Sequence, residues 1–176
     1  MSIPIILIIA ISLSMDAFSL ALIYGTLNLD QKLEITMSII VGIFHFFMPL
    51  LGFSIGKLIL SVIKINLSYI VGIIFIVLGV EMLFSINHSE KIKILTNIFS
   101  IIAFAFTVSI DSFSTGIALG AVKTNIIVSC LLFSVISCTF TYLGLVLGKK
   151  LSRDFGKVAI IIGSVILLVL GVKYLI

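Results

Sequence analysis

Charged residues are scarce in this chain: they make up 10% of its 176 residues, and tryptophan is absent altogether. Soluble domains carry about 25% charged residues and under about 50% apolar ones. Here 61% of the residues are hydrophobic and the mean hydropathy is +1.44, so a water-soluble domain could not hide the apolar surface. The composition therefore excludes a soluble protein and leaves no room for a soluble catalytic or sensory domain.

Cysteine is also scarce, since the chain contains only Cys130 and Cys138. On a single helix these two residues lie about 12 Å apart, at 1.5 Å per residue, which is too far for a disulfide bond. Neither has a Cys or His neighbour at the spacing of a metal site. We expect both to be small packing residues.

Dense basic tracts are missing too, although the formal net charge is +4. In a membrane protein an excess of Lys and Arg usually marks the cytoplasmic loops, so nucleic acid is not an expected partner. Residues 1–5 lack the basic segment that opens a cleaved signal peptide. We expect them to begin a helix that stays in the membrane.

Long apolar runs make up the rest of the chain. A membrane-spanning helix needs about 20 apolar residues, and the sequence divides into six such runs joined by short polar links. We therefore predict an all-α integral membrane protein with six transmembrane helices. Their approximate ranges are 2–27, 34–60, 67–86, 96–122, 125–147 and 155–174.

The two halves of the chain repeat each other, at an offset of about 95 residues that falls to about 92 later on. Because each copy has three helices, the second copy enters the membrane upside down relative to the first. Secondary transporters often have such inverted repeats, with the substrate site near the midplane. We predict one transmembrane transporter domain, with repeat 1 at 1–86, a linker at 87–95 and repeat 2 at 96–176. Matching positions are Ser12, Ser14, Asp16 and Ser19 with Thr107, Ser109, Asp111 and Ser114, and the close-packing glycines Gly52 and Gly56 with Gly144 and Gly148.

The distribution of Lys and Arg predicts the orientation in the membrane. The side that holds the links after the first, third and fifth helices carries seven of the eleven basic residues. We expect that side to be cytoplasmic, in the cell membrane, with both termini outside the cytoplasm.

Asp16 and Asp111 each lie near the middle of a long apolar run. A carboxylate in hydrocarbon costs at least about 2.5–3.5 kcal/mol on insertion scales, so an intramembrane Asp is by default a candidate functional residue. On a helix, positions i−4, i+3 and i+4 share a face with position i. That face carries Ser12 and Ser19 around Asp16, and Thr107, Ser114 and Thr115 around Asp111.

Two such carboxylates in low dielectric cannot both stay ionised unless a cation or protons neutralise them. The second helix supplies a further element, because Pro49 cannot donate to the carbonyl of His45. We expect either that carbonyl or the His45 imidazole to join the site. Carboxylate, hydroxyl and carbonyl oxygens suit Mg²⁺, Ca²⁺ and Mn²⁺. The predicted metal ligands are Asp16, Asp111, Ser12, Ser19, Thr107, Ser114 and His45.

These residues resemble those of the manganese efflux pumps of the MntP type, within the LysE-like exporter group. The resemblance covers essentially the whole chain, and rests on the order and spacing of several short motifs. The chain departs from the family at His45, where family members can carry an acidic residue, and in a shorter polar loop after the third helix. The matching segments are residues 14–18, 48–52, 109–112, 125–127 and 171–172.

The resemblance implies a transporter rather than an enzyme, with Asp16 and Asp111 on the metal pathway. No cofactor is expected, because Mn²⁺ would be the transported substrate. The expected partners are a divalent cation and the lipid bilayer, and a homo-oligomer is compatible with the sequence.

Three other functions compete with metal export. An exporter of a basic amino acid or another small solute is the alternative within the LysE-like group. An intramembrane aspartyl protease also uses two carboxylates, but such enzymes carry Gly-x-Gly-Asp where this chain has Val108, Ser109, Ile110 and Asp111. A structural scaffold would not need two matched carboxylates at mid-membrane.

Overall fold

The computed structural model describes residues 1–25, 27, 29–62, 67–85, 98–122, 124–150 and 154–175. Within these ranges the regular secondary structure is helical, and the predicted linker 87–95 lies outside them. The helices are α1 (Ile3–Gly25), α2 (Gln31–Val62), α3 (Leu67–Ser85), α4 (Ile98–Thr107), α5 (Ile110–Gly120), α6 (Ile126–Gly148) and α7 (Asp154–Leu175).

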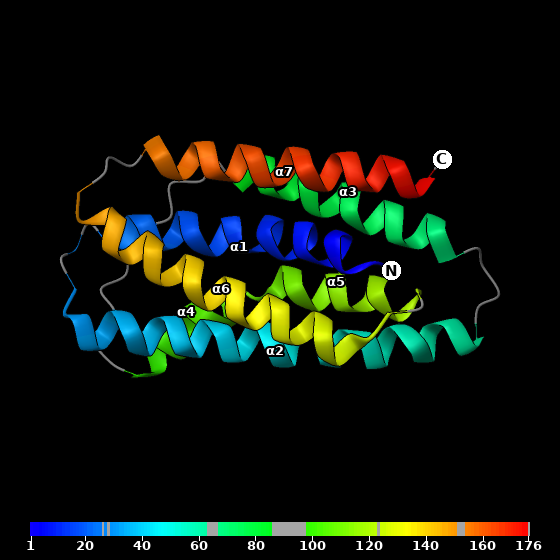
Figure 1. The fold of residues 1–176 in the computed structure, drawn as a ribbon, viewed down its shortest axis with the longest axis horizontal. Coiled ribbons are helices and arrows are strands. Elements are labelled where there is room, and N and C mark those ends of the chain that lie inside the picture. Colours follow the sequence, from blue (N-terminus) through cyan, green and yellow to red (C-terminus); the bar gives the residue numbers. More distant parts are fainter. Residues whose placement is uncertain are drawn as a thin grey trace.

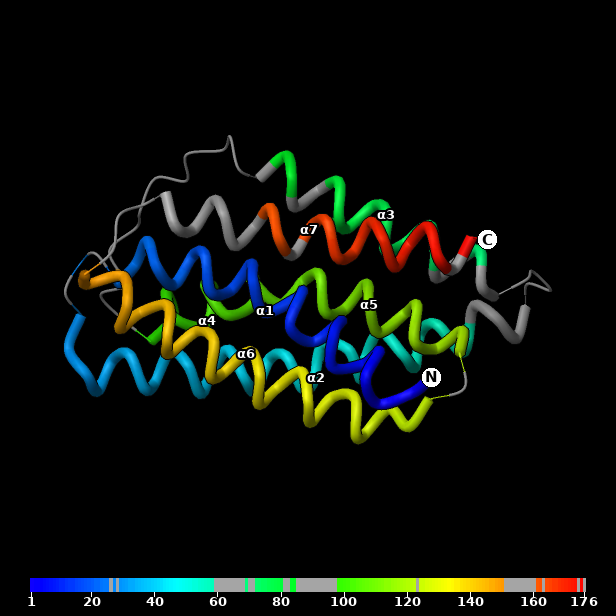
Figure 2. Tube along the Cα trace, turned by 45° about the horizontal axis from the view of Figure 1, so that its top comes forward, coloured from blue at the N-terminus to red at the C-terminus, as the bar shows by residue number. Residues whose placement is uncertain are grey.

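The helices run back and forth along one long axis (Figure 1), and α4 and α5 follow each other in the same direction. The two chain termini lie at the same end of the bundle in both ribbon views (Figures 1 and 2). With α4 and α5 counted as one bent segment, each of the six predicted apolar runs corresponds to helical structure. The helix α2 begins at Gln31, three residues before the predicted start.

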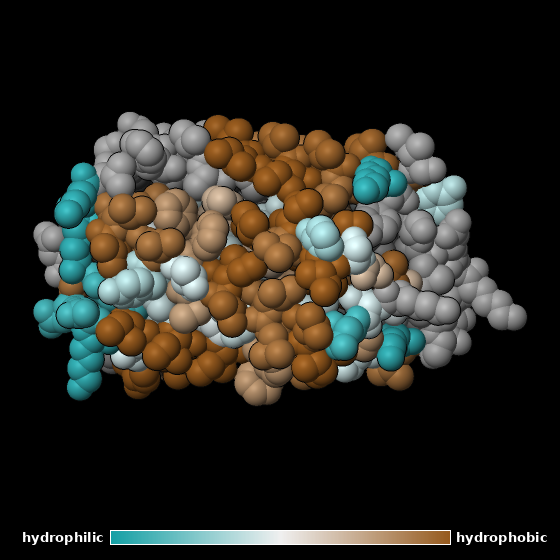
Figure 3. Space-filling view, viewed as in Figure 1, coloured by the Kyte–Doolittle hydropathy of each residue, from teal (hydrophilic) through white to brown (hydrophobic). Residues whose placement is uncertain are grey.

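The lengths and compositions of the helices fit a membrane protein. Among the described residues, α1, α2 and α6 are each long and apolar enough to cross a membrane, and the bent pair of α4 and α5 would make a fourth crossing. On the face shown in Figure 3, hydrophobic residues cover the middle of the molecule and hydrophilic ones gather toward its two ends. This belt matches a protein that faces lipid along its middle.

The predicted fourth helix, 96–122, is wrong as a single helix, because the chain breaks at Val108 and Ser109 and bends by 42°. Neither residue is Pro or Gly. Instead, the hydroxyls of Thr107 and Ser109 donate to the carbonyls of Ala103 and Ala105, at 2.9 and 2.7 Å. Such bonds to the carbonyl four residues back can bend helices, although Ser12, Ser14 and Ser19 make them on α1 without a break. At the break, Ser109 takes the non-helical dihedrals φ −109° and ψ 2°.

Glycines allow the helices to pack closely in pairs. The helix α1 packs on α6, α2 on α5 and α3 on α7. A Cβ atom on Gly148 would collide with the carbonyl of Leu22, and one on Gly116 with the carbonyl of Pro49. Close approach of backbones at small residues is a common way for membrane helices to associate. The predicted packing role of Gly52, Gly56, Gly144 and Gly148 is thus confirmed.

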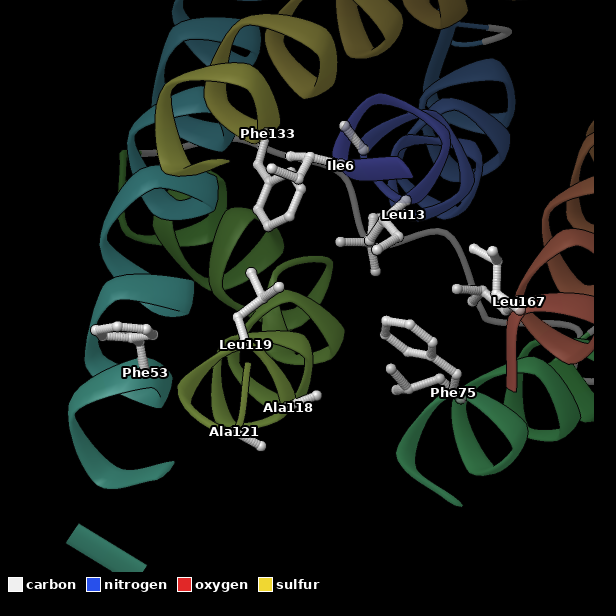
Figure 4. Close-up of a cluster of buried hydrophobic side chains, with 13 residues drawn as sticks. Ile6, Leu13, Phe53, Phe75, Ala118, Leu119, Ala121, Phe133 and Leu167 are labelled. Atoms are coloured by element: carbon white, nitrogen blue, oxygen red, sulfur yellow. The ribbon is translucent and has the colours of Figure 1, made fainter. Parts of the chain in front are cut away.

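Two clusters of buried apolar side chains form the core. The outer cluster, so named because it lies toward the termini, joins the first half of α1 to α2, α3, α5, α6 and α7 and includes Leu13, Leu119, Phe133 and Leu167. Figure 4 shows these side chains projecting from several helices into one region. The inner cluster lies toward the other end and joins the second half of α1 to α2, α4 and α6. Its members are Ala17, Ala21, Met37, Val41, Ile101, Phe104, Ala105, Val108 and Leu145.

Candidate metal site between the two apolar clusters

A layer of buried polar side chains separates the two apolar clusters. On α1 it lies between Leu13 of the outer cluster and Ala17 of the inner cluster, and the same order holds along α2, α6 and the broken segment. We call this set the central polar layer. Its fully buried members are Ser14, His45, Ser109, Ser112, Thr115, Ser137 and Thr141.

Two hydrogen bonds across the layer tie neighbouring helices together. The hydroxyls of Ser14 on α1 and Ser137 on α6 lie 2.9 Å apart. The hydroxyl of Ser109, at the helix break, lies 2.9 Å from Nδ1 of His45 on α2. Since Ser14 and Ser109 also donate to the carbonyls four residues back, each serine accepts the hydrogen bond that crosses between helices.

Asp111 sits in the first turn of α5, directly after the helix break. Its Oδ1 accepts a hydrogen bond of 2.7 Å from the backbone N–H of Ser112. The N-terminus of a helix carries partial positive charge, and this favours a carboxylate there. The break therefore gives Asp111 a backbone donor and a favourable dipole at the depth of the central polar layer.

Asp16 lies on the unbroken helix α1, between the two apolar clusters, and its side chain is partly buried. It follows Ser14 by two residues, just as Asp111 follows Ser109. The helix α1 and the broken segment run in opposite directions (Figure 1), so the chain passes from Ser14 to Asp16 in the direction opposite to that from Ser109 to Asp111.

The predicted hydroxyl ligands lie in different places. Ser12 and Ser19 are buried, and they donate to the carbonyls of Ile8 and Met15 at 2.9 and 2.7 Å. Ser114 is partly buried on α5, within the span of the central polar layer. Thr107 is exposed at the end of α4. The expectation that Thr107 and Asp111 share one helix face fails, because it presupposes an unbroken helix between them.

His45 is fully buried on α2. The helix continues through Pro49 without a break, although proline leaves the His45 carbonyl without its helical donor. The ring nitrogen Nδ1 lies 3.0 Å from the carbonyl oxygen of Val41. Both groups that the sequence singled out at His45, the carbonyl and the imidazole, therefore lie in the protein interior.

Carboxylates, thiols and imidazoles do not gather densely in the described part of the chain. Within it, no three His, Cys, Asp or Glu side chains are grouped as they would be to hold a metal ion. In this arrangement, a cation held by one or two of these side chains would take its remaining ligands from hydroxyl groups, backbone carbonyls or water. These are the oxygen ligands that Mn²⁺ accepts.

Several members of the central polar layer are not among the metal ligands predicted from the sequence. Ser137 lies about 92 residues after His45, which is the offset of the repeat in this part of the chain. The predicted repeat therefore pairs the two positions, and this pairing could have identified them. Nothing in the local pattern marked Ser112 or Thr141, because single hydroxyls on apolar helices are common and their burial depends on packing.

Comparison with known proteins decides the family. A family model described as "Putative manganese efflux pump" matches residues 28–175. The chain belongs to the MntP family. Similar proteins named "Putative manganese efflux pump MntP" include those of Bacillus pumilus, 38% identical over 96% of this chain and 92% of the relative, and Geobacillus thermodenitrificans, 34% identical over the same shares. That of Bacillus licheniformis is 37% identical over 94% of this chain and 90% of the relative. No solved structure matches the chain.

Membership of the MntP family confirms the family predicted from the sequence. The match runs through α2 to α7 and includes His45, Asp111 and the helix break. The family name describes a transporter and a manganese substrate, which agrees with the apolar helices of this membrane protein.

Proposed function

We propose that this chain exports Mn²⁺ from the cytoplasm as a secondary-type transporter, by alternating access around Asp16 and Asp111. The main support is that both carboxylates lie between the two buried apolar clusters, at the depth of the central polar layer. Carboxylates at such a depth are costly and mark ion pathways. Family membership supplies the choice of manganese.

The proposed architecture is six spans in two inverted repeats, and the packing contacts support it. Gly42 on α2 lies against Ser134 on α6, which is its own repeat equivalent. Gly72 approaches the carbonyl of Gly171, and Gly79 approaches the carbonyl of Ser164. At an offset of about 92 residues, Gly72 corresponds to Ser164 and Gly79 corresponds to Gly171, so each contact is the repeat counterpart of the other. Contacts that come in such exchanged pairs are what a pseudo-two-fold axis produces.

The two hydrogen bonds across the layer fit the same relation. Ser14 corresponds to Ser109 at an offset of about 95 residues, and His45 corresponds to Ser137. The bond from Ser14 to Ser137 therefore has the bond from Ser109 to His45 as its counterpart. The repeats meet at this layer, which is where inverted-repeat transporters bind substrate.

The proposed ligands combine charge from the carboxylates with neutral oxygens. A hydroxyl that donates its proton to a carbonyl keeps its oxygen lone pairs, so Ser12 and Ser19 remain able to bind a cation. Thr107 can join only in a state in which α4 turns about the break. The full proposed set is Asp16, Asp111, Ser12, Ser19, Thr107, Ser114 and His45.

The broken segment is the element that we expect to move. Discontinuous helices at mid-membrane are frequent at the sites of secondary transporters. Rotation of α4 against α5 at Val108 and Ser109 would alter access to Asp111 while the dipole of α5 continues to face the carboxylate. Cation binding or protonation then neutralises the carboxylates in turn.

We further propose that the end holding Lys149 and Lys150 faces the cytoplasm. Both lysines are exposed after α6, at the end of the bundle opposite the chain termini (Figure 1). The positive-inside tendency then places both termini on the outer side of the cell membrane.

Transport into inverted membrane vesicles tests this function. Vesicles with the intact chain should accumulate Mn²⁺ and not lysine, whereas vesicles with Asp16→Asn and Asp111→Asn should accumulate neither. Asp30→Asn is the matched control, because Asp30 is an exposed carboxylate before α2 and outside the layer. Accumulation of lysine without Mn²⁺ would favour the basic amino acid exporter and overturn the proposal.

A further inference from the structure

The orientation of the His45 ring can be deduced from its neighbours. Nδ1 lies 3.0 Å from the carbonyl oxygen of Val41 and 2.9 Å from the hydroxyl of Ser109. A carbonyl only accepts, and the Ser109 hydroxyl already donates to Ala105, so Nδ1 must carry the proton. In the neutral ring, Nε2 therefore carries a lone pair and no proton.

Nε2 is buried and has no hydrogen-bond partner among the residues that the structure describes. Leaving a buried polar atom unpartnered costs about 1–3 kcal/mol, and native proteins rarely do so without water, an ion or a functional reason. In the described part of the chain, oxygens that are likewise buried without a partner occur on α5 and α6, two of the helices that pack against α2. They are the hydroxyl oxygens of Ser112, Thr115 and Thr141.

Ser137, the repeat counterpart of His45, shows which side-chain group is enough to join two helices at this position. It makes the counterpart bond to Ser14 with a hydroxyl. A serine thus suffices to hold two helices together at this position, whereas His45 brings a second ring nitrogen that the packing contact does not use. Metal-bound histidines almost always donate their other ring N–H to a carboxylate, a backbone carbonyl or water, and Val41 provides such a carbonyl.

We infer that Nε2 of His45 binds the transported cation and provides the nitrogen ligand that sets the preference of the site for Mn²⁺ over Mg²⁺ and Ca²⁺. This inference rests on the proposed function, because the cation is the one held by Asp16 and Asp111. The three side chains are not grouped in the described structure, so the inference requires the movement of the broken segment that the proposed function includes. Mn²⁺ shares the preference of Mg²⁺ and Ca²⁺ for oxygen ligands, but it is a first-row transition-metal ion and gains more from an imidazole nitrogen than the alkaline-earth ions do. Replacing one oxygen by nitrogen therefore weakens the competition from Mg²⁺ and Ca²⁺.

Pulsed electron paramagnetic resonance on the Mn²⁺-loaded, purified full chain detects such a ligand directly. The intact protein should show ¹⁴N coupling to the bound Mn²⁺. The coupling should disappear in His45→Gln and persist in the control Ser38→Ala, which removes a buried hydroxyl from the same helix. Bound Mn²⁺ without ¹⁴N coupling in the intact protein, or coupling that persists in His45→Gln, would overturn this inference and leave the proposed function standing. If the intact chain binds no Mn²⁺, the proposed function fails as well.

A selectivity measurement separates ligation from packing. His45→Ser keeps a hydroxyl donor at the position, as its equivalent Ser137 does, but removes Nε2. In inverted vesicles that carry this variant, the Mg²⁺ concentration that halves Mn²⁺ uptake should fall about tenfold, which corresponds to about 1.4 kcal/mol. A purely structural His45 would instead lower thermal stability and leave the ratio of Mg²⁺ to Mn²⁺ unchanged, and that result would contradict the inference.

Discussion

Glu34 and Lys149 form an ion pair, with Nζ of Lys149 2.7 Å from Oε1 of Glu34. The pair joins the start of α2 to the residue that follows α6. The Glu34 side chain is 3% exposed and that of Lys149 is 34% exposed, so the carboxylate depends on the lysine while the lysine can still reach water. The ion pair lies at the end of the bundle that we propose to be cytoplasmic.

Loss of Lys149 should therefore destabilise the protein. Lys149→Met leaves the Glu34 carboxylate buried without its cation, which should cost roughly 1–3 kcal/mol. Thermal unfolding of the purified protein in detergent measures the effect. Lys150→Met is the matched control and should unfold like the intact chain, because Lys150 is exposed. Equal stabilities of the two variants would contradict a stabilising role for the pair.

Gly116 should not tolerate a larger side chain. A Cβ atom at this position would meet the backbone of Pro49, and backbone atoms cannot move aside as a flexible side chain can. Gly116→Val should cost about 1–3 kcal/mol through overpacking and separate α5 from α2. Unfolding in detergent tests this, with Ile110→Phe as the control because Ile110 is 49% exposed on the same helix. A stable Gly116→Val would show that α2 and α5 are not held by this contact.

The bond between Ser14 and Ser137 should give a measurable coupling energy. Hydrogen bonds between membrane helices average about 0.6 kcal/mol in double-mutant cycles and reach about 1.7. We expect a coupling in this range between Ser14→Ala and Ser137→Ala, from unfolding free energies. A second cycle with Ser12→Ala in place of Ser14→Ala should give none, because Ser12 donates to the carbonyl of Ile8. Equal coupling in the two cycles would argue against the bond across the layer.

The orientation in the membrane can be read from cysteine labelling. The native thiols are first removed by Cys130→Ala and Cys138→Ala. The added thiols of Ser2→Cys and Lys150→Cys then lie at opposite ends of the bundle, and both positions are exposed to the reagent. An impermeant maleimide should label Ser2→Cys in intact cells and Lys150→Cys only after the cells are opened. The reverse pattern would show that the termini are cytoplasmic.

The helices themselves could largely be predicted from the sequence. In a membrane, an apolar run of about 20 residues forms a helix because its backbone N–H and C=O groups must bond to each other. The described helices follow those runs. Pro49 shows the limit of local rules, since α2 continues through it. Membrane helices tolerate proline where neighbours satisfy the backbone, and Gly116 lets α5 approach closely at this position.

The helix break and the contacts of the site could not be predicted in the same way. Val108 and Ser109 include neither Pro nor Gly, and hydroxyl bonds to the carbonyl four residues back also occur on the unbroken α1, so no local pattern marks the break. The contact between His45 and Ser109 joins residues far apart in the sequence, and only the register of two packed helices brings them together. The predicted repeat nevertheless pointed to these contacts, because positions that it pairs make corresponding hydrogen bonds.

Manganese sensitivity of growing cells tests the central claim most directly. In cells that lack their own manganese exporter, the intact chain and Asp30→Asn should restore growth at a toxic Mn²⁺ concentration. Asp111→Asn, produced at the same level in the membrane, should not restore growth, because the site then loses one of its two carboxylates. If Asp111→Asn protects the cells as well as the intact chain does, the account of manganese export through the paired carboxylates is wrong.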